Sequence, residues 1–353
     1  MINSNKRNFL KKLILSIIIV AVLTSGIVFI FDPFFHYHKP IKPLKAVLTQ
    51  AEYQVIGTLR TFDYDSLIAG SSMAENYNNK WFDETFDCVA IKAVKPGANT
   101  SDLNYLLQAA YEEKDIKNIF YTLDISALTT IIQDHFVNEG MPLYLYNKNP
   151  FDDVKYLFNK HVIFEDIPYM IANSFIGNYD EGDSFNWAQY KEFGTLHYTP
   201  TESLQPVKSL DEYAHYVDYN MDILENLVKE HPETNYIFMV PPYSSLWWYE
   251  AYMCGDLELN YYALDQAFTR LLPYKNVEIH YFQTMEDIVT NLNLYMDLIH
   301  YHPDVNKSLV ELIPSNQYKV TLDTKDEVLN RMKQLVHRCV NEYAPIYFEE
   351  LEK

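Results

Sequence analysis

An apolar run near the start of the chain constrains its fold most strongly, because residues 13–31 are 19 consecutive residues without a charge. As a helix rising 1.5 Å per residue, the run would be about 28 Å long, close to the roughly 30 Å of a bilayer's hydrocarbon core. A cleaved signal peptide is the alternative, but its apolar stretch is usually about 7–15 residues long and ends at a site with small residues. Here more apolar residues follow Thr24, Ser25 and Gly26, so the run favours an uncleaved membrane anchor.

The charges around this run predict which way it crosses the membrane. No acidic residue occurs before Asp32, whereas four basic residues precede the run: Lys6, Arg7, Lys11 and Lys12. The positive-inside rule therefore predicts a cytoplasmic tail over residues 1–12, a transmembrane anchor over residues 13–31 and an extracellular remainder. All 48 Asp+Glu fall in that remainder, and the formal net charge of the chain is −20. This charge argues against nucleic acid as a partner, because binding phosphate needs clustered Lys and Arg.

Residues 32–50 predict a juxtamembrane linker. Their first part reads DPFFHYHKPIKP, in which three prolines oppose a helix and the aromatic residues suit the membrane interface. We expect His36 and His38 to be interface residues rather than metal ligands.

Short β-rich apolar runs alternate with helical patterns in the rest of the chain. The runs are expected to be strands, at 66–69, 89–94, 119–123, 236–240 and 277–281. Stretches with a helical apolar period separate them, at 101–113, 210–230, 260–272 and 325–340. This alternation predicts an α/β domain with a mostly parallel sheet over residues 51–353. Residues from about 141 to 205 break the rhythm with aromatic and polar sequence, and predict an inserted subregion of short helices and loops.

The cysteine content does not indicate a disulfide scaffold or a zinc site. Cys88, Cys254 and Cys339 are few and widely separated, and no C-x-x-C pair occurs. The sequence is compatible with two states of these cysteines: one disulfide with one free thiol, or three free thiols.

The first expected strand runs directly into Gly70-Ser71-Ser72. In a parallel α/β sheet, functional groups are exposed at the carboxyl edge of the strands, and a helix that starts there presents backbone N–H groups to a developing negative charge. A nucleophilic serine at this place would need a base within hydrogen-bond reach and an acid that orients the base. Considered alone, G-S-S also fits an ordinary strand-to-helix turn in which a serine caps the helix.

A second motif near the end of the chain supplies those partners. Asp297 precedes His300 by three residues, so its carboxylate can bind one ring nitrogen and leave the other free to take a proton from a serine. Considered alone, the motif also fits a surface histidine beside an acid. A metal site is a further alternative, because four ligand types crowd into eight residues: Asp297, His300, His302 and Asp304.

Together the two motifs resemble the SGNH (GDSL-like) hydrolase superfamily, which has an early G-x-S block and a late D-x-x-H block. The resemblance implies a flavodoxin-like three-layer sandwich and a catalytic triad of Ser72, His300 and Asp297. Ser72 is the implied nucleophile because it is the third residue of G-S-S, whereas Ser71 falls on the variable middle position. No metal or organic cofactor is implied.

The resemblance also implies donors for an oxyanion hole, the first of which is the backbone N–H of Ser72. The superfamily's second block supplies a glycine after the second strand, and Gly97 lies at the matching place. The third block normally carries an asparagine, but Asp124 stands there and cannot donate a hydrogen bond unless it is protonated. Asn99 is the candidate substitute.

The resemblance is closer to the membrane-anchored SGNH-like proteins of Gram-positive surface-polymer clusters, and more distant to the D-alanyl-lipoteichoic acid biosynthesis protein D. The anchor, the D-P-F-F-H-Y-H stretch, F-D-Y-D-x-x-x-x-G-x-S-M-x-E-N and D-x-x-H-Y carry it. It implies a serine esterase or O-acyltransferase that acts on acyl esters of a cell-surface glycan or wall polymer, often beside a multi-pass membrane acyltransferase. The alternative is a non-catalytic extracellular scaffold that uses the same fold to bind the polymer or that partner.

Aromatic residues after the fourth expected strand are candidate substrate contacts. Tyr243, Trp247 and Trp248 would lie at the same sheet edge as the motifs, where their rings could stack on sugar faces or line an acyl pocket. Glu75 and Asn76, directly after the serine, could face the pocket or form a solvated first helical turn.

Overall fold

The structure, a computed structural model, describes residues 2–131, 134–136 and 140–351. The chain divides into two compact units. The N-terminal unit contains Met1–Phe62 and Gly140–Glu181, and the sheet unit contains Asp63–Glu139 and Gly182–Lys353. These units differ from the predicted division into a linker over residues 32–50, a domain over 51–353 and an insertion over about 141–205. Residues 51–62 and 140–181 belong to the unit that contains the anchor and the linker, and residues 182–205 belong to the sheet unit.

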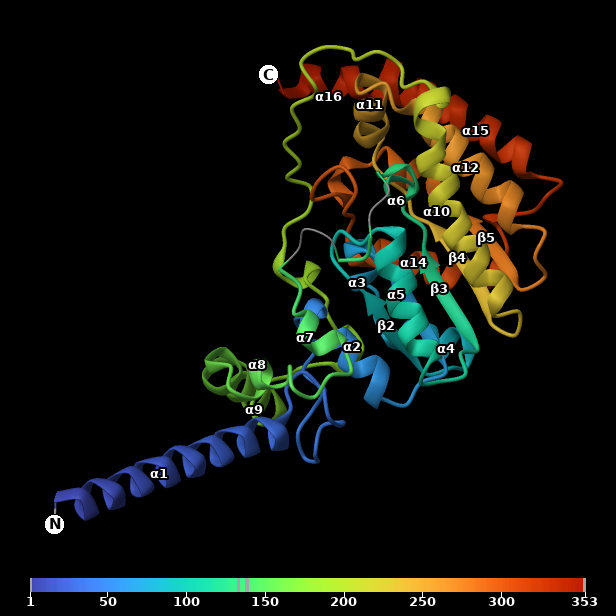
Figure 1. The fold of residues 1–353 in the computed structure, drawn as a ribbon. Coiled ribbons are helices and arrows are strands. Elements are labelled where there is room, and N and C mark those ends of the chain that lie inside the picture. The colour runs from blue at the N-terminus through green and yellow to red at the C-terminus, as the bar shows by residue number, and fades with distance from the viewer. Residues whose placement is uncertain (1, 132–133, 137–139, 352–353) are drawn as a thin grey trace. The chain divides into compact units, whose positions relative to one another are not determined.

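The sheet unit is built on a six-stranded, mostly parallel sheet with the strand order β2-β1-β3-β4-β5-β6 (Figure 1). Its strands are β1 (Ser66–Gly70), β2 (Ala90–Val94), β3 (Asn118–Thr122), β4 (Asn235–Val240), β5 (Val277–Tyr281) and β6 (Lys319–Val320). All neighbours pair in parallel except β5 and β6, which pair antiparallel. The predicted α/β class with a mostly parallel sheet is therefore confirmed. The two-residue β6 was not predicted, because so short a segment carries no alternating pattern.

Helices connect the strands of the sheet unit. The α-helices are α3 (Ser72–Glu75), α4 (Asn79–Phe86), α5 (Thr100–Tyr111), α6 (Ile125–Thr129), α10 (Leu210–Glu230), α11 (Ser245–Met253), α12 (Leu257–Leu271), α13 (Glu286–Val289), α14 (Pro303–Leu312), α15 (Lys325–Arg338) and α16 (Ala344–Leu351). Shorter turns are η2 (Glu181–Asp183), η3 (Ala188–Tyr190), η4 (Phe282–Thr284), η5 (Leu292–Leu294), η6 (Ile313–Ser315) and the π-helical η7 (Cys339–Tyr343). α10 packs against α5, α6 and α12, and α4 packs against α14.

The core of the sheet unit explains why its strands read as continuous apolar runs. β1 and β3 are buried at every residue, since both lie inside the sheet and are covered on their two faces. Cys88 and Cys339 are buried and Cys254 is half-buried, and all three are free thiols.

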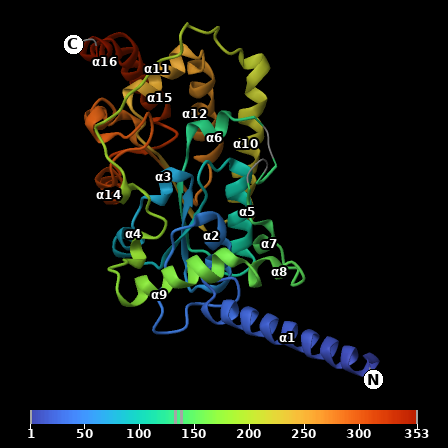
Figure 2. The ribbon, with the colours of Figure 1, turned by 90° about the vertical axis from the view of Figure 1, so that its left-hand side faces the viewer.

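The N-terminal unit contains the long apolar helix α1 (Ile2–Phe31). Within the described residues, Lys6–Phe31 is the one helical stretch long and apolar enough to cross a membrane, and the mean hydropathy of 2.9 refers to an 18-residue window inside it. The unit also contains α2 (Ala51–Thr61), α7 (Leu143–Tyr146), α8 (Val154–Leu157), the π-helical η1 (Val162–Asp166) and α9 (Ile167–Phe175). In Figure 2, α8 and α9 lie beside the carboxyl end of α1.

The buried side chain of Asp32 organises the residues directly after α1. Its carboxylate accepts hydrogen bonds from the backbone N–H groups of His36, Tyr37 and His38, at 3.0, 2.7 and 2.9 Å, and from the hydroxyl of Tyr156 on α8 at 2.8 Å. Three prolines prevent a helix here, so a buried carboxylate satisfies backbone donors that would otherwise lack partners.

Helix α2 belongs to the N-terminal unit because its side chains bind the linker. The amide of the buried Gln54 accepts from the N–H groups of residues 49 and 50 and donates to the carbonyls of Pro33 and Val47. A Cβ on Gly57 would lie 2.1 Å from the carbonyl oxygen of Phe34, so only glycine permits this approach. Periodicity within 51–61 does not reveal such long-range polar contacts.

Candidate active site

A tight turn at the end of β1 presents Ser72. A Cβ on Gly70 would lie 2.8 Å from the Cβ of Ala74 and 2.9 Å from the Cβ of Thr122, so the turn requires glycine. Ser71 is the N-cap of α3, and Ser72 is the first residue of that helix. The strand-to-helix turn expected of G-S-S is therefore present, with the Ser72 side chain at the carboxyl edge of the sheet.

The structure brings Ser72, His300 and Asp297 into one hydrogen-bonded series. The Ser72 hydroxyl lies 2.8 Å from Nε2 of His300, and Nδ1 of His300 lies 2.6 Å from Oδ2 of Asp297. All three residues are half-buried. With Asp297 ionised, Nδ1 must carry the proton, so Nε2 is the acceptor for the Ser72 hydroxyl.

The carboxylate of Asp297 is held in its charged form. Burial raises the pKa of Asp297, but hydrogen bonds from the His300 ring, the His300 N–H and the Ile299 N–H outweigh burial, and the net pKa is lowered. The two N–H bonds to Oδ1 measure 2.8 and 2.9 Å. One oxygen therefore shapes the turn while the other binds the ring.

A short hairpin, rather than a helical turn, presents Asp297 and His300. Tyr295 and Tyr301 form an antiparallel bridge, and the N–H of Met296 donates to the carbonyl of His300 at 2.9 Å. The loop after β4 holds the turn, because the N–H and the hydroxyl of Ser244 both donate to the carbonyl of Leu298, at 3.1 and 2.7 Å.

Two backbone N–H groups are available as oxyanion donors. Among the described residues, no hydrogen bond engages the N–H of Ser72 or of Gly97. Gly97 is exposed and has a φ of +61°, which glycine adopts without strain. Their role as donors stays a prediction.

Asn99 has a structural role that the sequence did not indicate. Its side-chain oxygen accepts from the N–H of Asp102 at 2.8 Å, and the Asp102 carboxylate accepts from the N–H of Asn99 at 3.1 Å. This reciprocal pair caps α5. A donor role for Asn99 could use only its amide nitrogen, and it stays a prediction.

Asp124 lies buried next to the nucleophile's turn. It accepts hydrogen bonds from the hydroxyl of Ser71 at 2.5 Å and from the hydroxyl of Tyr243 at 2.8 Å. Burial raises the pKa of Asp124, against the opposing effect of these two bonds. Both carboxylate oxygens are engaged as acceptors, so Asp124 anchors the N-cap of α3 instead of donating to an oxyanion.

Two of the three aromatic candidates for substrate contact require correction. Tyr243 is buried, and its hydroxyl donates to Asp124. Trp248 is also buried, and its indole N–H donates to the side-chain oxygen of Gln283 at 2.9 Å. Trp247 is half-buried and packs on Tyr243, with ring centroids 4.6 Å apart. Trp247 therefore keeps exposed surface, whereas the other two rings are core.

Sequence reasoning missed Trp187, which contacts two members of the series. Its ring meets the His300 ring edge-on, with centroids 5.0 Å apart at 89°, and its indole N–H donates to the carbonyl of Ser72 at 3.2 Å. Trp187 lies in an irregular stretch of the chain, so no local pattern marks it.

Glu75 and Asn76, which follow Ser72, are buried, and this excludes a solvated first helical turn. The side-chain oxygen of Asn76 accepts from the N–H of Ala188 at 3.2 Å. The carbonyl of Glu75 accepts from the ammonium of Lys92 at 2.7 Å, and that ammonium also donates to the carbonyl of Ser184. Burial lowers the pKa of Lys92 to about 7, with Glu75 and Asp183 acting in the opposite direction.

The remaining candidate metal ligands are engaged locally. Nδ1 of His302 accepts from the N–H of Asp304 at 3.2 Å and caps α14. No group of three or more metal-ligating side chains occurs in the part of the chain that the structure describes. In the linker, Nε2 of His36 lies 3.1 Å from Asp153, and the His38 ring contacts the carbonyls of Phe29 and Lys39.

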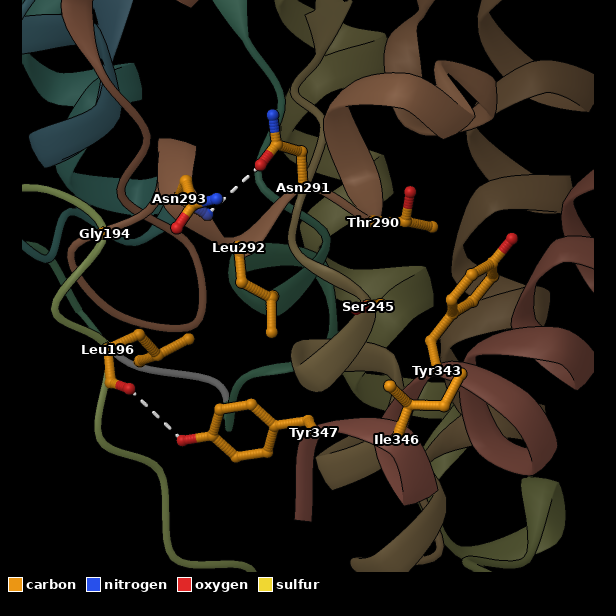
Figure 3. A pocket seen from close by; sticks show the side chains of 10 residues that line it. All are labelled: Gly194, Leu196, Ser245, Thr290, Asn291, Leu292, Asn293, Tyr343, Ile346 and Tyr347. Carbon is orange, nitrogen blue, oxygen red and sulfur yellow. Dashed lines mark hydrogen bonds between the residues drawn. The ribbon is translucent and has the colours of Figure 1, made fainter. Parts of the chain in front are cut away.

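A pocket of about 340 Å³ lies beside the hairpin that carries His300 (Figure 3). Its lining is uncharged and consists of Gly194, Leu196, Ser245, Thr290, Asn291, Leu292, Asn293, Tyr343, Ile346 and Tyr347. Two backbone links connect it to the hairpin. The N–H of Gly194 donates to the carbonyl of Tyr295 at 2.9 Å, and Ser245 directly follows Ser244, which binds Leu298.

Comparison with known proteins leaves the family unassigned. No family model matches the chain, and no curated protein matches it. A solved chain described as "a putative platelet activating factor from Streptococcus pneumonia" matches with 11% identity and a TM-score of 0.40. The match covers 76% of this chain and 91% of that chain.

Proposed function

We propose that this protein is a membrane-anchored, extracytoplasmic serine esterase or O-acyltransferase that acts on acyl esters of a cell-surface glycan or wall polymer. The observation that carries the proposal is the series Ser72–His300–Asp297, with contacts of 2.8 and 2.6 Å. A hydroxyl on an unprotonated ring nitrogen, with a carboxylate on the other nitrogen, is the arrangement that makes serine a nucleophile.

The chemistry proceeds in two steps. Nε2 of His300 takes the proton of Ser72 as its oxygen attacks the ester carbonyl, and the N–H groups of Ser72 and Gly97 stabilise the oxyanion. Losing one such donor typically lowers the rate by about 10²–10³-fold. His300 then gives the proton to the departing alkoxide, which leaves an acyl-enzyme. Water attacks this ester in an esterase, and a sugar or polyol hydroxyl attacks it in a transferase.

The uncharged pocket beside the hairpin supports a neutral, hydroxyl-rich substrate. Asn291 and Asn293 present exposed amides, which can donate to and accept from sugar hydroxyls, and tyrosine and aliphatic side chains can pack on sugar C–H faces. A volume of about 340 Å³ lies within the range of small-ligand sites. We propose this pocket as a binding site for one unit of the polymer.

Serine-directed labelling tests the proposed nucleophile. A fluorophosphonate applied to the full-length protein in its native membranes, where any acyltransferase partner is present, is expected to label the wild type. Labelling should be lost in both Ser72→Ala and His300→Ala and kept in Ser203→Ala, which changes an exposed serine. Labelling that persists in Ser72→Ala would contradict the proposal. Absent labelling with tight binding of the polymer would favour the scaffold.

Asn293→Ala tests the proposed polymer site. We expect KM for an acylated polysaccharide from the same cells to rise about tenfold, since one or two hydrogen bonds of about 0.5–1.5 kcal/mol are lost, with kcat unchanged. Hydrolysis of a small synthetic ester, which is too short to reach the pocket, should not change. Asn330→Ala, on the exposed face of α15, is the matched control. An unchanged KM for the polysaccharide would remove this pocket from the proposal.

A further inference from the structure

Four large apolar side chains of the N-terminal unit are unusually exposed. Phe151 precedes α8, Phe164 lies in η1, Phe175 ends α9 and Ile176 follows it, with exposed fractions of 85%, 74%, 61% and 87%. We name these four residues the apolar platform. Three phenylalanine rings and an isoleucine are thus exposed within 26 residues of sequence. Large exposed apolar surface is unfavourable in water and marks contact with a partner or a lipid surface.

The platform's helices pack against the part of α1 nearest its carboxyl end. α8 and η1 contact α1, and Figure 2 shows α8 and α9 beside that end. Val28 is fully buried and Ala21, Thr24 and Ser25 are half-buried, whereas the large apolar residues from Phe9 to Val20 are exposed. Over residues 6–31, α1 is therefore covered only in its last turns.

Polar contacts fix this arrangement at the end of α1. Tyr156 of α8 donates to Asp32, the first residue after α1, at 2.8 Å. Asp153, directly before α8, lies 3.1 Å from Nε2 of His36 and accepts from the hydroxyl of Tyr37 at 3.1 Å. The platform's position along α1 is thus set by buried and half-buried contacts rather than by a free linker.

This position has a consequence for depth in the membrane. If residues 13–31 cross the hydrocarbon core, the ten-residue rise from Ala21 to Phe31 corresponds to about 15 Å, half of a core of about 30 Å. Elements that cover α1 between Ala21 and Val28 then lie at the level of the outer leaflet. Apolar side chains exposed on those elements would meet lipid, not water.

We propose that residues 151–176 lie at the level of the outer leaflet, next to the membrane–water interface, and that the apolar platform contacts lipid. The bilayer is the occupant that the geometry favours, because the platform is continuous with a helix whose own surface is lipid-facing. Aromatic rings suit this interface, and the exposed side chains of Lys155 and Lys160 can reach lipid phosphates. The inference depends on retention of α1 as an anchor and not on the catalytic assignment.

Depth-dependent quenching tests the platform. Phe164→Trp and Ile176→Trp would be made separately in the full-length protein and reconstituted in phosphatidylcholine nanodiscs with or without brominated acyl chains. The wild-type signal from its four tryptophans is subtracted. We expect brominated lipid to lower the added emission about twofold or more, and acrylamide to quench it weakly. Tyr190→Trp, at a position 74% exposed in the sheet unit, is the control. Its added emission should be quenched strongly by acrylamide and should not change with brominated lipid.

Three results would overturn the proposal. Added tryptophans that acrylamide quenches as strongly as in Tyr190→Trp would place the platform in water. Added tryptophans shielded from both quenchers would place it in a protein interface. An intact mass lacking residues 1–31 would remove the anchor itself. Fluorophosphonate labelling of the same samples reports separately on Ser72, so failure of the platform and failure of the catalytic proposal are distinguishable.

Discussion

Replacing Ser72 with alanine is expected to lower kcat/KM for ester hydrolysis by about 10⁴–10⁶-fold, because the attacking oxygen is removed while binding and the oxyanion donors remain. The fold should persist. Ser72 is half-buried, Ser71 rather than Ser72 occupies the N-cap position of α3, and the hydroxyl of Ser72 bonds only to His300 among the described contacts. Steady-state hydrolysis of a small acyl ester measures the rate, and the thermal unfolding midpoint measures the fold.

Ser203→Ala is the matched control for this variant, since the same atom is removed from an exposed position. Ser72→Ala activity within tenfold of the wild type, with an unchanged unfolding midpoint, would reject Ser72 as the nucleophile. A lower unfolding midpoint would instead show that the hydroxyl supports the turn.

Asp297→Asn is expected to lower kcat by about 10⁴-fold. The introduced amide would donate to Nδ1 of His300, where the carboxylate now accepts at 2.6 Å, so the ring proton would move to Nε2. Nε2 could then no longer accept the proton of Ser72. Oδ1 can be replaced by the amide oxygen, which still accepts from the N–H groups of Ile299 and His300. The turn should therefore remain folded.

The effect of Asp297→Asn should be present throughout the neutral pH range. The pKa of Asp297 is lowered in the folded protein, so its charge contributes stability above the unfolded-state pKa, and this contribution is lost as the pH falls through the folded-state pKa. The pH dependence of the free energy of unfolding measures this contribution, and a pH–rate profile measures the effect on the rate. The double variant with Ser72→Ala should be no slower than Ser72→Ala alone, because the two residues act as a unit. An Asp297→Asn rate within tenfold of the wild type would reject the orienting role.

The strands and the meeting of the two motifs could be predicted because they depend on local pattern and on a general rule of topology. Apolar runs of five or six residues lie in the interior of a parallel sheet, and the carboxyl ends of such strands share one edge. G-S-S ends β1, and the hairpin with Asp297 and His300 is held by the loop after β4. Motifs more than two hundred residues apart thus reach the same edge.

The surroundings of the motifs could not be predicted, because they depend on which distant segments pack there. Trp187 contacts His300 from an irregular stretch, and Tyr243 and Trp248 are buried by partners on other elements, Asp124 and Gln283. No periodicity within a short window contains these contacts. The grouping of α2 with the anchor depends similarly on Gln54 and Gly57.

The amino-acid sequence alone determined the long apolar helix, the α/β class, the five parallel strands and the identity of the residues that meet at the sheet edge. Hydrophobic period, chain direction and turn chemistry are local properties, and each is written in consecutive residues. Only the tertiary structure decided which aromatic rings are core, what Asp124 and Asn99 bind, and where the exposed rings of 151–176 lie along α1. Burial and hydrogen bonding are properties of pairs of segments, and packing selects those pairs only when the whole chain has folded.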